Sequence, residues 1–509
     1  MEKQRKIPKA RKRTPKAVIA LLLAAALAIP FSSCQSAGTV TDSSGKKTKV
    51  TTAKLDPKDP VTLTVWHYYN GEVMYAFDNL VKEFNETVGV EQGIIVEGVG
   101  IGDVIGLRDA VFAAARKDVG SQELPNIFAS YPDTAYAAQR IGLLADIGQY
   151  ISDKNREQYI TSYIDEGRIG LHNELRIFPI AKSTEVFLLN ETAWKPFADA
   201  CGFTHDDLAT VEGVVRVAEA YYKWTDAQTP AIPNDGKAFS GRDSLSNMFL
   251  IGFKQLGVEL FEVATGSVTI NADKEVLRQL WDTYYVPYIS GHFLSAGRFR
   301  SDDAKVGDII SYIGSTASAG YFPSRAMDGA DMYDVEATIL PAPVFANGES
   351  VIVQQGAGMV VTKGTTKEEY ASIVFLKWFT DIDVNTRFAA YSGYMPVKKD
   401  ANDYEKFMSI VEANGIQSSA TTAKTLSVAF AALQNSEAYT SKAFDGGTEA
   451  RQILDASLQD KAVADRTAVL AALAKGQSYD SVIALFNTEA NFTAWADLFI
   501  ASLHTAAGQ

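Results

Sequence analysis

Strand-like and helix-like segments alternate along the chain from residue 61, and this alternation constrains the fold more than any other feature. Residues 61–66 (VTLTVW) are apolar and β-branched, and apolar positions then recur at spacings of four, three and four between residues 73 and 84. The run predicts a strand, and the spacing predicts an amphipathic helix. A strand at 93–96, a helix at 104–116 and a strand at 126–130 continue the order. The alternation predicts an α/β fold with a parallel, doubly wound sheet.

The chain has 509 residues, which is too long for one compact core. Two lobes or domains are therefore expected. Short apolar segments at 177–180 and 185–189 flank residues 181–184, an arrangement typical of a crossing between lobes. Residues 366–369 (TKEE) predict a capping box that opens a helix, and the chain from about residue 448 is alanine-rich and helical in pattern.

The first 34 residues differ from the rest of the chain. A basic stretch precedes an apolar run at 17–29, and the sequence FSSC ends at Cys34. This pattern predicts a secretory signal at 1–33, because the apolar run is too short for a lasting membrane span. Small residues before Cys34 resemble the lipobox of bacterial lipoproteins, in which the cysteine becomes the lipidated N-terminus. Phe31 stands where leucine is usual, and ordinary secretion with cleavage nearby is the alternative.

Residues 34–59 are rich in Ser, Thr, Lys, Asp and Pro, and they predict a flexible tether. Removing residues 1–33 takes away 8 of 48 basic residues and 1 of 61 acidic ones, which leaves 40 and 60 and a formal charge of −20. Such a chain is a poor partner for nucleic acid. Only Cys201 remains beside a lipidated Cys34, so no internal disulfide is expected, and Cys201 is predicted to be a small buried side chain.

The sequence carries no pattern that indicates catalysis or a metal. None of the five histidines has a second histidine or a cysteine at metal-ligand spacing, so no metal and no cofactor is predicted. Glycines at 98–102 have the wrong spacing for a dinucleotide loop and predict a tight turn before a helix. Residues 381–385 imitate a calcium loop without its glycine and glutamate, and they predict an ordinary helix start. No nucleophile elbow or Walker loop occurs, and no carboxylate pair stands out, so we do not expect an enzyme.

Nine segments follow one another along the chain in this order: VTLTVWHYYNGE, LVKEFN, ELPNIFASYPD, RIGLLADIGQYI, FPIAKSTEVFLLN, ISYIGSTASAG, ILPAPV, QQGAGMVV and SGYMPVKKDA. Taken together they resemble the family 1 extracellular solute-binding proteins of bacterial ABC importers, the cluster that includes maltose-binding and glycerol-phosphate-binding proteins. The match is spread over most of residues 61–400. Each segment alone is weak, but their order behind a lipoprotein-like signal is specific.

The resemblance implies a periplasmic-binding-protein-like fold, with two α/β lobes joined by a hinge of several crossings (type II). Lobe 1 would comprise 60–183 and 341–396, and lobe 2 would comprise 184–340 and 397–509. A small solute, a sugar or oligosaccharide, would bind between the lobes and close the hinge. The permease subunits of the importer would recognise the closed form. The protein would be a secreted monomer, lipid-anchored to the cell envelope on the periplasmic or extracellular face of the membrane.

The candidate ligand contacts lie in loops that follow strands, at the crossing segment and at glycines that allow close approach. They are Trp66, His67, Tyr68, Asp103, Tyr131, Asp133, Ser183, Arg242, Gly314, Ser315, Gly356 and Tyr394. Each has a plainer alternative: core packing for Trp66, a helix N-cap for Asp133, a hinge hydrogen bond for Ser183, tight turns for the glycines and a surface ion pair for Arg242.

The ligand is predicted to be neutral. Where a glycerol-phosphate binder of the resembled family supplies an arginine before a glycine, Phe444 takes approximately that place, although a shifted Arg451 could serve. An aromatic ring beside an acidic residue suits a sugar and repels a dianion. A polyol-phosphate binder of the same family, a two-lobed sensor and a carbohydrate-processing extracellular lipoprotein enzyme are the alternatives.

Overall fold

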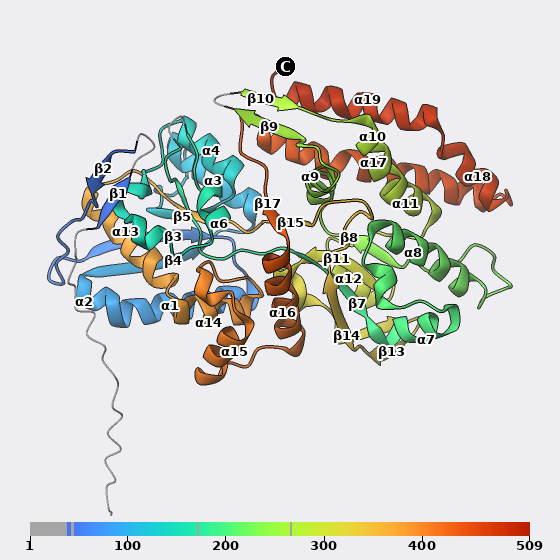
Figure 1. Cartoon of the computed structure of the whole chain (residues 1–509), viewed down its shortest axis with the longest axis horizontal. Helices are drawn as coiled ribbons and strands as arrows, with labels where there is room; N and C mark the ends of the chain where they lie inside the picture. Colours follow the sequence, from blue (N-terminus) through green and yellow to red (C-terminus); the bar gives the residue numbers. More distant parts are fainter. Residues whose placement is uncertain (1–37, 42–44, 171–172, 265–266) are drawn as a thin grey trace, which may run out of the picture. The chain divides into compact units, whose positions relative to one another are not determined.

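The computed structural model describes residues 38–41, 45–170, 173–264 and 267–509 (Figure 1). The predicted signal at 1–33, the predicted lipidation of Cys34 and His172 lie outside the described residues. Among the helices of the described part, none combines the length and the apolar character needed to cross a membrane.

Lobe 1 is built on a five-stranded sheet of order β4-β3-β5-β16-β6. Its strands are β3 (Val61–His67), β4 (Ile94–Gly100), β5 (Ile127–Ser130), β6 (Ile177–Phe178) and β16 (Gly358–Val361). The three strands predicted at 61–66, 93–96 and 126–130 are parallel to one another, as expected. The sheet is mixed, because β16 returns from late in the chain and pairs antiparallel with β5 and β6.

The helices of lobe 1 cover this sheet. They are α1 (Gly71–Phe84), α2 (Val90–Gln92), α3 (Val104–Arg116), α4 (Pro132–Arg140), α5 (Asp153–Arg156), α6 (Thr161–Glu166), α13 (Thr366–Phe379) and α14 (Ile382–Ser392). The predicted apolar face of α1 is buried at Phe77, Leu80 and Phe84 in the same core as Leu63 and Val65 of β3. The observed capping box lies one residue before the predicted one: Thr365 is the N-cap of α13, and Glu368 is its partner. The helix start predicted at 381–385 is confirmed, with Asp381 as its N-cap.

Lobe 2 is built on a four-stranded sheet of order β14-β7-β11-β8. Its strands are β7 (Glu185–Asn190), β8 (Ser240–Arg242), β11 (Ser311–Ser315) and β14 (Ala337–Pro341). Only β8 and β11 are parallel, so the parallel arrangement predicted from residues 61–130 does not extend to this lobe. β7 is buried along its whole length, and it follows directly on the predicted crossing at 181–184.

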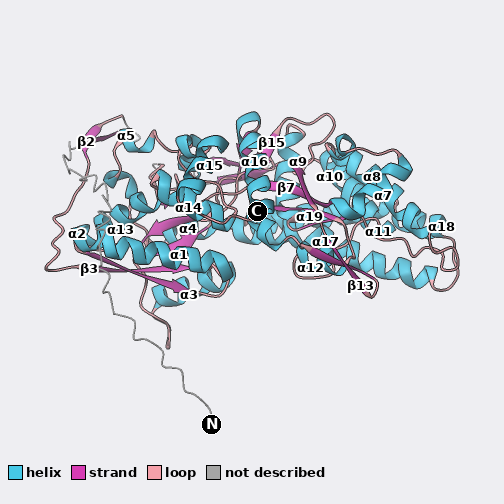
Figure 2. Ribbon diagram, turned by 90° about the horizontal axis from the view of Figure 1, so that it is seen from below, coloured by secondary structure: helices cyan, strands magenta, loops and turns pink. Residues whose placement is uncertain are grey.

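The helices of lobe 2 belong to two cores, one that holds α7 and α8 together with β7 and one that holds α9, α10, α17 and α19. Figure 2 shows α7, α8, α17 and α19 at the same end of the molecule. The helices of this lobe are α7 (Glu191–Cys201), α8 (Val211–Asp226), α9 (Leu245–Gln255), α10 (Lys274–Leu280), α11 (Val286–Ser290), α12 (Arg300–Val306), α17 (Gly447–Leu473), α18 (Tyr479–Phe486) and α19 (Glu489–Ala506). Phe249, Trp281, Leu454 and Phe499 share one core. Cys201 is exposed at the end of α7, so its predicted burial is wrong.

Several segments pass between the lobes. Lys182 pairs with Met395 and Ser183 pairs with Gln355, each as an isolated antiparallel bridge. Phe345, Val351 and Val353 pack in the core of lobe 2, so the second part of lobe 1 has its own core residues only from Ala357 onward, and not from the predicted residue 341. The remaining elements are α15 (Tyr404–Ala413), α16 (Ala420–Asn435) and the strand pairs β1 (Thr39–Thr41) with β2 (Lys47–Lys49), β9 (Phe261–Ala264) with β10 (Ser267–Ile270), β12 (Arg325–Asp328) with β13 (Asp331–Asp334), and β15 (Val351–Val353) with β17 (Glu437–Tyr439).

Candidate ligand-binding site

A cavity of about 340 Å³ lies where strand ends and helix N-termini of the two lobes meet. Lobe 1 contributes the first turns of α3 and α4, lobe 2 contributes the first turn of α9 and part of α17, and residues 353–355 of the crossing segment complete the wall. Open α/β sheets bind small molecules at such strand ends. Among the residues that line the cavity are Tyr131, Asp133, Glu166, Ser246, Asn247, Gln354, Gln355, Arg451 and Asp455.

The sequence starts α4 directly at the end of a buried strand. β5 ends at Ser130, Tyr131 is the N-cap, and Pro132 occupies the first helical position, where its missing N–H costs nothing. The first N–H groups of a helix have no partner within the helix. Because residues 131–134 line the cavity, this helix start offers hydrogen-bond donors to a ligand.

Tyr131 lines the cavity, whereas the predicted contacts Tyr68 and Tyr394 do not. The Tyr131 ring stacks on that of Tyr68 with centroids 6.5 Å apart and an interplanar angle of 18°. Tyr394 stacks on a different ring, that of Phe388, with centroids 6.4 Å apart. Burial raises the pKa of Tyr68, of Tyr131 and of Tyr394, so the three phenols stay protonated at neutral pH. A ring face with hydroxyl groups beside it is suited to a sugar.

Asp133 and Arg451 face each other in the cavity. Arg451 Nε lies 3.4 Å from Asp133 Oδ2, and the carboxyl is largely buried. Burial raises the pKa of Asp133, while the charge of Arg451 acts in the opposite direction. The N-cap alternative for Asp133 is wrong, because α4 begins at Pro132 and its N-cap is Tyr131.

A polar network of the crossing segments lies behind the cavity wall. Lys182 Nζ donates to Glu166 Oε1 at 2.7 Å and to the carbonyl of Gly356 at 2.8 Å. Gln354 Nε2 donates to the carbonyl of Ser162 at 3.1 Å and also to Glu166. The lysine and the glutamate are almost fully buried, so this pair ties α6 of lobe 1 to two crossing segments.

The predicted residues Ser183 and Arg242 belong to a neighbouring network. Ser183 and Gln355 exchange backbone hydrogen bonds of 2.9 and 3.0 Å, and Arg242 forms an ion pair with Glu185. Asn247 Nδ2 donates to Glu185 Oε1 at 3.0 Å and to Gln355 Oε1 at 2.8 Å. Gln355 and Asn247 line the cavity, whereas Ser183 and Arg242 do not. The two predicted residues therefore act indirectly, by holding Gln355 and Asn247 in place. The ion pair of Arg242 is buried, whereas the sequence suggested a surface pair.

The remaining predicted contacts of lobe 1 lie outside the cavity. Trp66 is 2% exposed and His67 is 1% exposed, so both pack in the core of the lobe. Burial lowers the pKa of His67 to about 4, and the ring is neutral at physiological pH. Asp103 is the N-cap of α3, where it accepts from the Gly106 N–H at 2.9 Å, and it lies 3.7 Å from Arg298 of lobe 2.

The predicted glycines serve packing and the crossing. A Cβ at Gly314 would lie 2.6 Å from Asp243 Oδ2. Ser315 caps the following 3-10 turn through the Ala317 N–H. Gly356 has φ of +98°, and a Cβ there would lie 3.0 Å from the carbonyl oxygen of Ala181. Tight packing at Gly314 and a turn at Gly356, the plainer explanations for these glycines, fit this geometry.

Sequence reasoning missed Asn247, Gln355, Ser246 and Asp455. Asn247 and Ser246 lie in the loop sequence that also suggested Arg242, and Gln355 lies beside the glycines of QQGAG. The available signal was a polar residue in the first turn of a helix, here α9, whose N-cap is Ser244 and which the sequence analysis did not predict. Asp455 accepts from the Ser246 N–H at 2.7 Å, across 209 residues of sequence that no local pattern connects.

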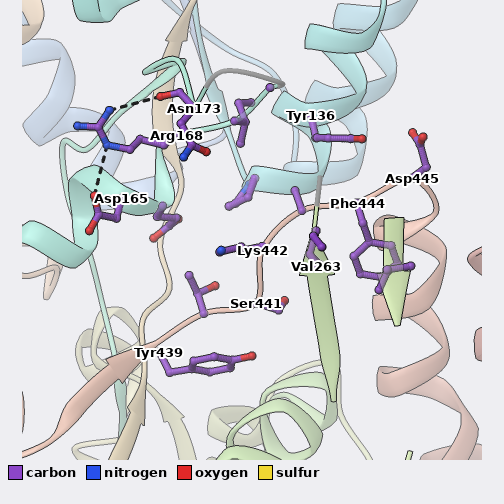
Figure 3. Close-up of a pocket in the computed structure, with 18 of the residues that line it drawn as sticks. Tyr136, Asp165, Arg168, Asn173, Val263, Tyr439, Ser441, Lys442, Phe444 and Asp445 are labelled. Atoms are coloured by element: carbon purple, nitrogen blue, oxygen red, sulfur yellow. Dashed lines mark hydrogen bonds and ion pairs between the residues drawn. The ribbon is translucent and has the colours of Figure 1, made fainter. Parts of the chain in front are cut away.

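A second cavity of about 920 Å³ adjoins the first across Glu166, Gln354 and Tyr439, which line both. Figure 3 shows Ser441, Lys442 and Phe444 of the segment after β17 opposite Tyr136 and Arg168. This cavity is lined by α6 and by the ends of β9 and β17, and the first turns of α3 and α9, which line the smaller cavity, do not reach it. Phe444 packs on Phe261 with centroids 5.0 Å apart, and Arg451 is the residue that reaches the smaller cavity. In the described ranges no three His, Cys, Asp or Glu residues are grouped so as to hold a metal ion.

The sequence matches one family of known proteins. The family model described as bacterial extracellular solute-binding protein matches residues 79–415. The chain therefore belongs to this family, which is one of binding proteins. A sequence search of curated proteins finds no match.

Solved structures share the fold at low sequence identity. The cyclic alpha-maltosyl-1,6-maltose binding protein from Arthrobacter globiformis is 18% identical, with a TM-score of 0.62 over 88% of this chain and 99% of that chain. UgpB from Mycobacterium tuberculosis, in complex with glycerophosphocholine, is 16% identical, with a TM-score of 0.60 over 87% and 98%. The galacto-N-biose-/lacto-N-biose I-binding protein of the ABC transporter from Bifidobacterium longum is 15% identical, with a TM-score of 0.61 over 89% and 99%. The predicted two-lobed, periplasmic-binding-protein-like α/β fold is confirmed.

Proposed function

We propose that the protein captures a neutral carbohydrate for an ABC importer, and that it does so in the 340 Å³ cavity. The observation that carries the proposal is a cavity walled by both lobes, with the Tyr131 ring on one side and the amides of Asn247 and Gln355 on another. Its volume falls within the range of small-molecule sites, about 300–1,000 Å³. A ligand that contacts both lobes favours the closed form, which is the form that a permease would recognise.

The charges of the cavity support a neutral ligand. Each charged side chain in the wall already has a partner within the chain: Arg108 with Asp109, Asp133 with Arg451, Glu166 with Lys182, and Asp455 with the N–H of Ser246. A phosphate is held best by a cation that is not already engaged, in addition to N–H donors such as those at the start of α4. The formal charge of −20 after removal of residues 1–33 acts in the same direction.

Calorimetry with di- and oligosaccharides and with glycerol phosphate tests the proposal. Tyr131→Ala removes the stacking face and should weaken sugar binding about fivefold, as expected for loss of about 1 kcal/mol of ring contact. Tyr391→Ala is the matched control, because Tyr391 is exposed on α14 and does not line the cavity. Equal affinity of the parent and Tyr131→Ala would contradict the assignment of the site. Recovery of chemically altered sugar after incubation would contradict a pure binding role and favour the enzyme alternative.

A polyol phosphate ester is a second candidate ligand, because Arg451 lines the cavity and UgpB was solved with glycerophosphocholine. A hydrogen bond from a charged group contributes about 1.5–3 kcal/mol, so Arg451→Met should weaken binding of such an ester by a factor of ten or more. Binding of a neutral sugar should change far less. Tight binding of the ester that is lost in Arg451→Met would replace the neutral ligand by the anionic one.

The proposed function also includes export by the signal predicted at 1–33 and lipidation of Cys34. Lipidation of Cys34 would hold the protein on the outer face of a membrane, close to the permease.

A further inference from the structure

The first described residues form a β-hairpin that packs on lobe 1. β1 pairs antiparallel with β2, and Val40 of β1 is only 7% exposed. The Thr41 N–H and hydroxyl donate to Asp153 of α5 at 3.2 and 2.7 Å, and the Thr51 N–H donates to the carbonyl of Gln149 at 2.9 Å. The hairpin is therefore part of the lobe, and the prediction of a flexible tether over 34–59 is wrong for residues 39–41 and 47–49.

The hairpin begins very close in sequence to the predicted anchor. Only three residues lie between Cys34 and Gly38, whose carbonyl accepts from the Val50 N–H at 3.0 Å. The four residue-to-residue steps from Cys34 to Gly38 span at most about 14 Å even when fully extended. A lipid on Cys34 would thus hold the hairpin and α5 within about that distance of the membrane surface.

The charge of this region is opposite to that of the rest of the chain. Residues 45–55 contain four lysines and no acidic residue, whereas acidic residues outnumber basic ones 61 to 48 in the whole chain. Lys47 and Lys49 are exposed on β2, and Lys154 is exposed on the adjoining α5. Basic residues beside a lipid anchor are attracted to anionic headgroups, by about 1 kcal/mol each, or about fivefold in affinity.

We propose that the face of lobe 1 formed by the β1–β2 hairpin and α5 lies against an anionic lipid bilayer. The proposal rests on the proposed lipidation of Cys34. It gives the protein a fixed orientation, with lobe 1 on the membrane and lobe 2 free to move when the cleft opens and closes. Figure 1 shows β1 and β2 on the first lobe and α7, which ends at Cys201, on the second.

Headgroup quenching on the full-length lipidated protein tests the orientation. One sample carries a fluorophore on the native, exposed Cys201. The other carries it on Thr52→Cys in a Cys201→Ser background, since Thr52 is exposed just after the hairpin. Both are reconstituted in vesicles that contain phosphatidylglycerol and a nitroxide-labelled headgroup. We expect strong quenching at position 52, weak quenching at Cys201, and loss of the difference at high salt.

Neutralisation of the lysines gives the second measurement. Lys47→Gln/Lys49→Gln should weaken the contact about thirtyfold and reduce the quenching at position 52. Lys305→Gln/Lys475→Gln is the matched control, with both lysines exposed in lobe 2, and it should leave the quenching unchanged. Equal quenching at the two labels in vesicle-bound protein would overturn the orientation alone. Absence of the protein from the vesicle fraction would overturn both the anchor and the orientation.

Discussion

Replacement of Lys182 by methionine should destabilise the protein more than almost any other single charge removal. The side chain is 1% exposed, and its hydrogen bonds to Glu166 and to the Gly356 carbonyl are 2.7 and 2.8 Å long. Lys182→Met has a similar length but leaves the Glu166 carboxylate, 5% exposed, without its cation. Removing one partner of a buried pair costs about 3–5 kcal/mol. Gln354 still donates to Glu166, so we expect a loss near the lower end, about 3 kcal/mol.

Urea unfolding of the mature protein, followed by tryptophan fluorescence, measures this loss. The double variant Lys182→Met/Glu166→Leu should recover most of it, because no uncompensated charge remains. Lys223→Met is the control: its ion pair with Glu219 is exposed on α8, and its loss should cost less than about 0.5 kcal/mol. A free energy of unfolding for Lys182→Met that matches this control would show that the buried pair does not stabilise the crossing.

Three further outcomes are expected. A ligand at a hundred times its dissociation constant should raise the free energy of unfolding by about 2.7 kcal/mol, because it binds only the folded state, and a thermal-shift assay measures this increase. A saturating ligand that leaves the melting temperature unchanged would contradict binding to the folded state. Acidification from pH 7 to 5 should destabilise the fold by about 2 kcal/mol through His67. The folded pKa of His67, about 4, lies below the unfolded value of about 6.5, so the unfolded chain binds the proton first. The free energy of unfolding of His67→Gln should therefore change less steeply with pH. Cys34→Ala should abolish partition into detergent-extracted membranes, and unchanged partition would refute the anchor.

The local pattern of the sequence predicted the elements that frame the site. The helix at 104–116 is observed with the same bounds, and the strands at 61–66 and 126–130 are observed within one residue at each end. These segments depend on apolar periodicity, which is a local property. The mixed character of the sheets was not predictable in this way, because β16 reaches its partner β5 from more than two hundred residues away.

The candidate site was predictable only where it belongs to a strand end. Tyr131 and Asp133 follow β5 directly and line the cavity, while the placement of Tyr68 next to Tyr131 follows from the parallel pairing of β3 and β5. Arg451 reaches Asp133 across 318 residues of sequence, and Asn247 reaches Gln355 across 108. Such pairs are set by how the two lobes approach each other, and no composition or spacing in either segment contains that information.

The β1–β2 hairpin shows why composition misled the prediction of a tether. A segment rich in Ser, Thr and Lys cannot build a core of its own, and this is the property that its composition measures. It can still dock on a core that other residues have built. A single apolar side chain, Val40, is buried, and Thr41 finds in Asp153 a carboxylate that accepts two hydrogen bonds. Thr41→Val should therefore release the hairpin without unfolding lobe 1, and amide exchange in β1 and β2 should accelerate while that of β3 stays slow. Unchanged protection of the hairpin in this variant would show that backbone pairing alone holds it.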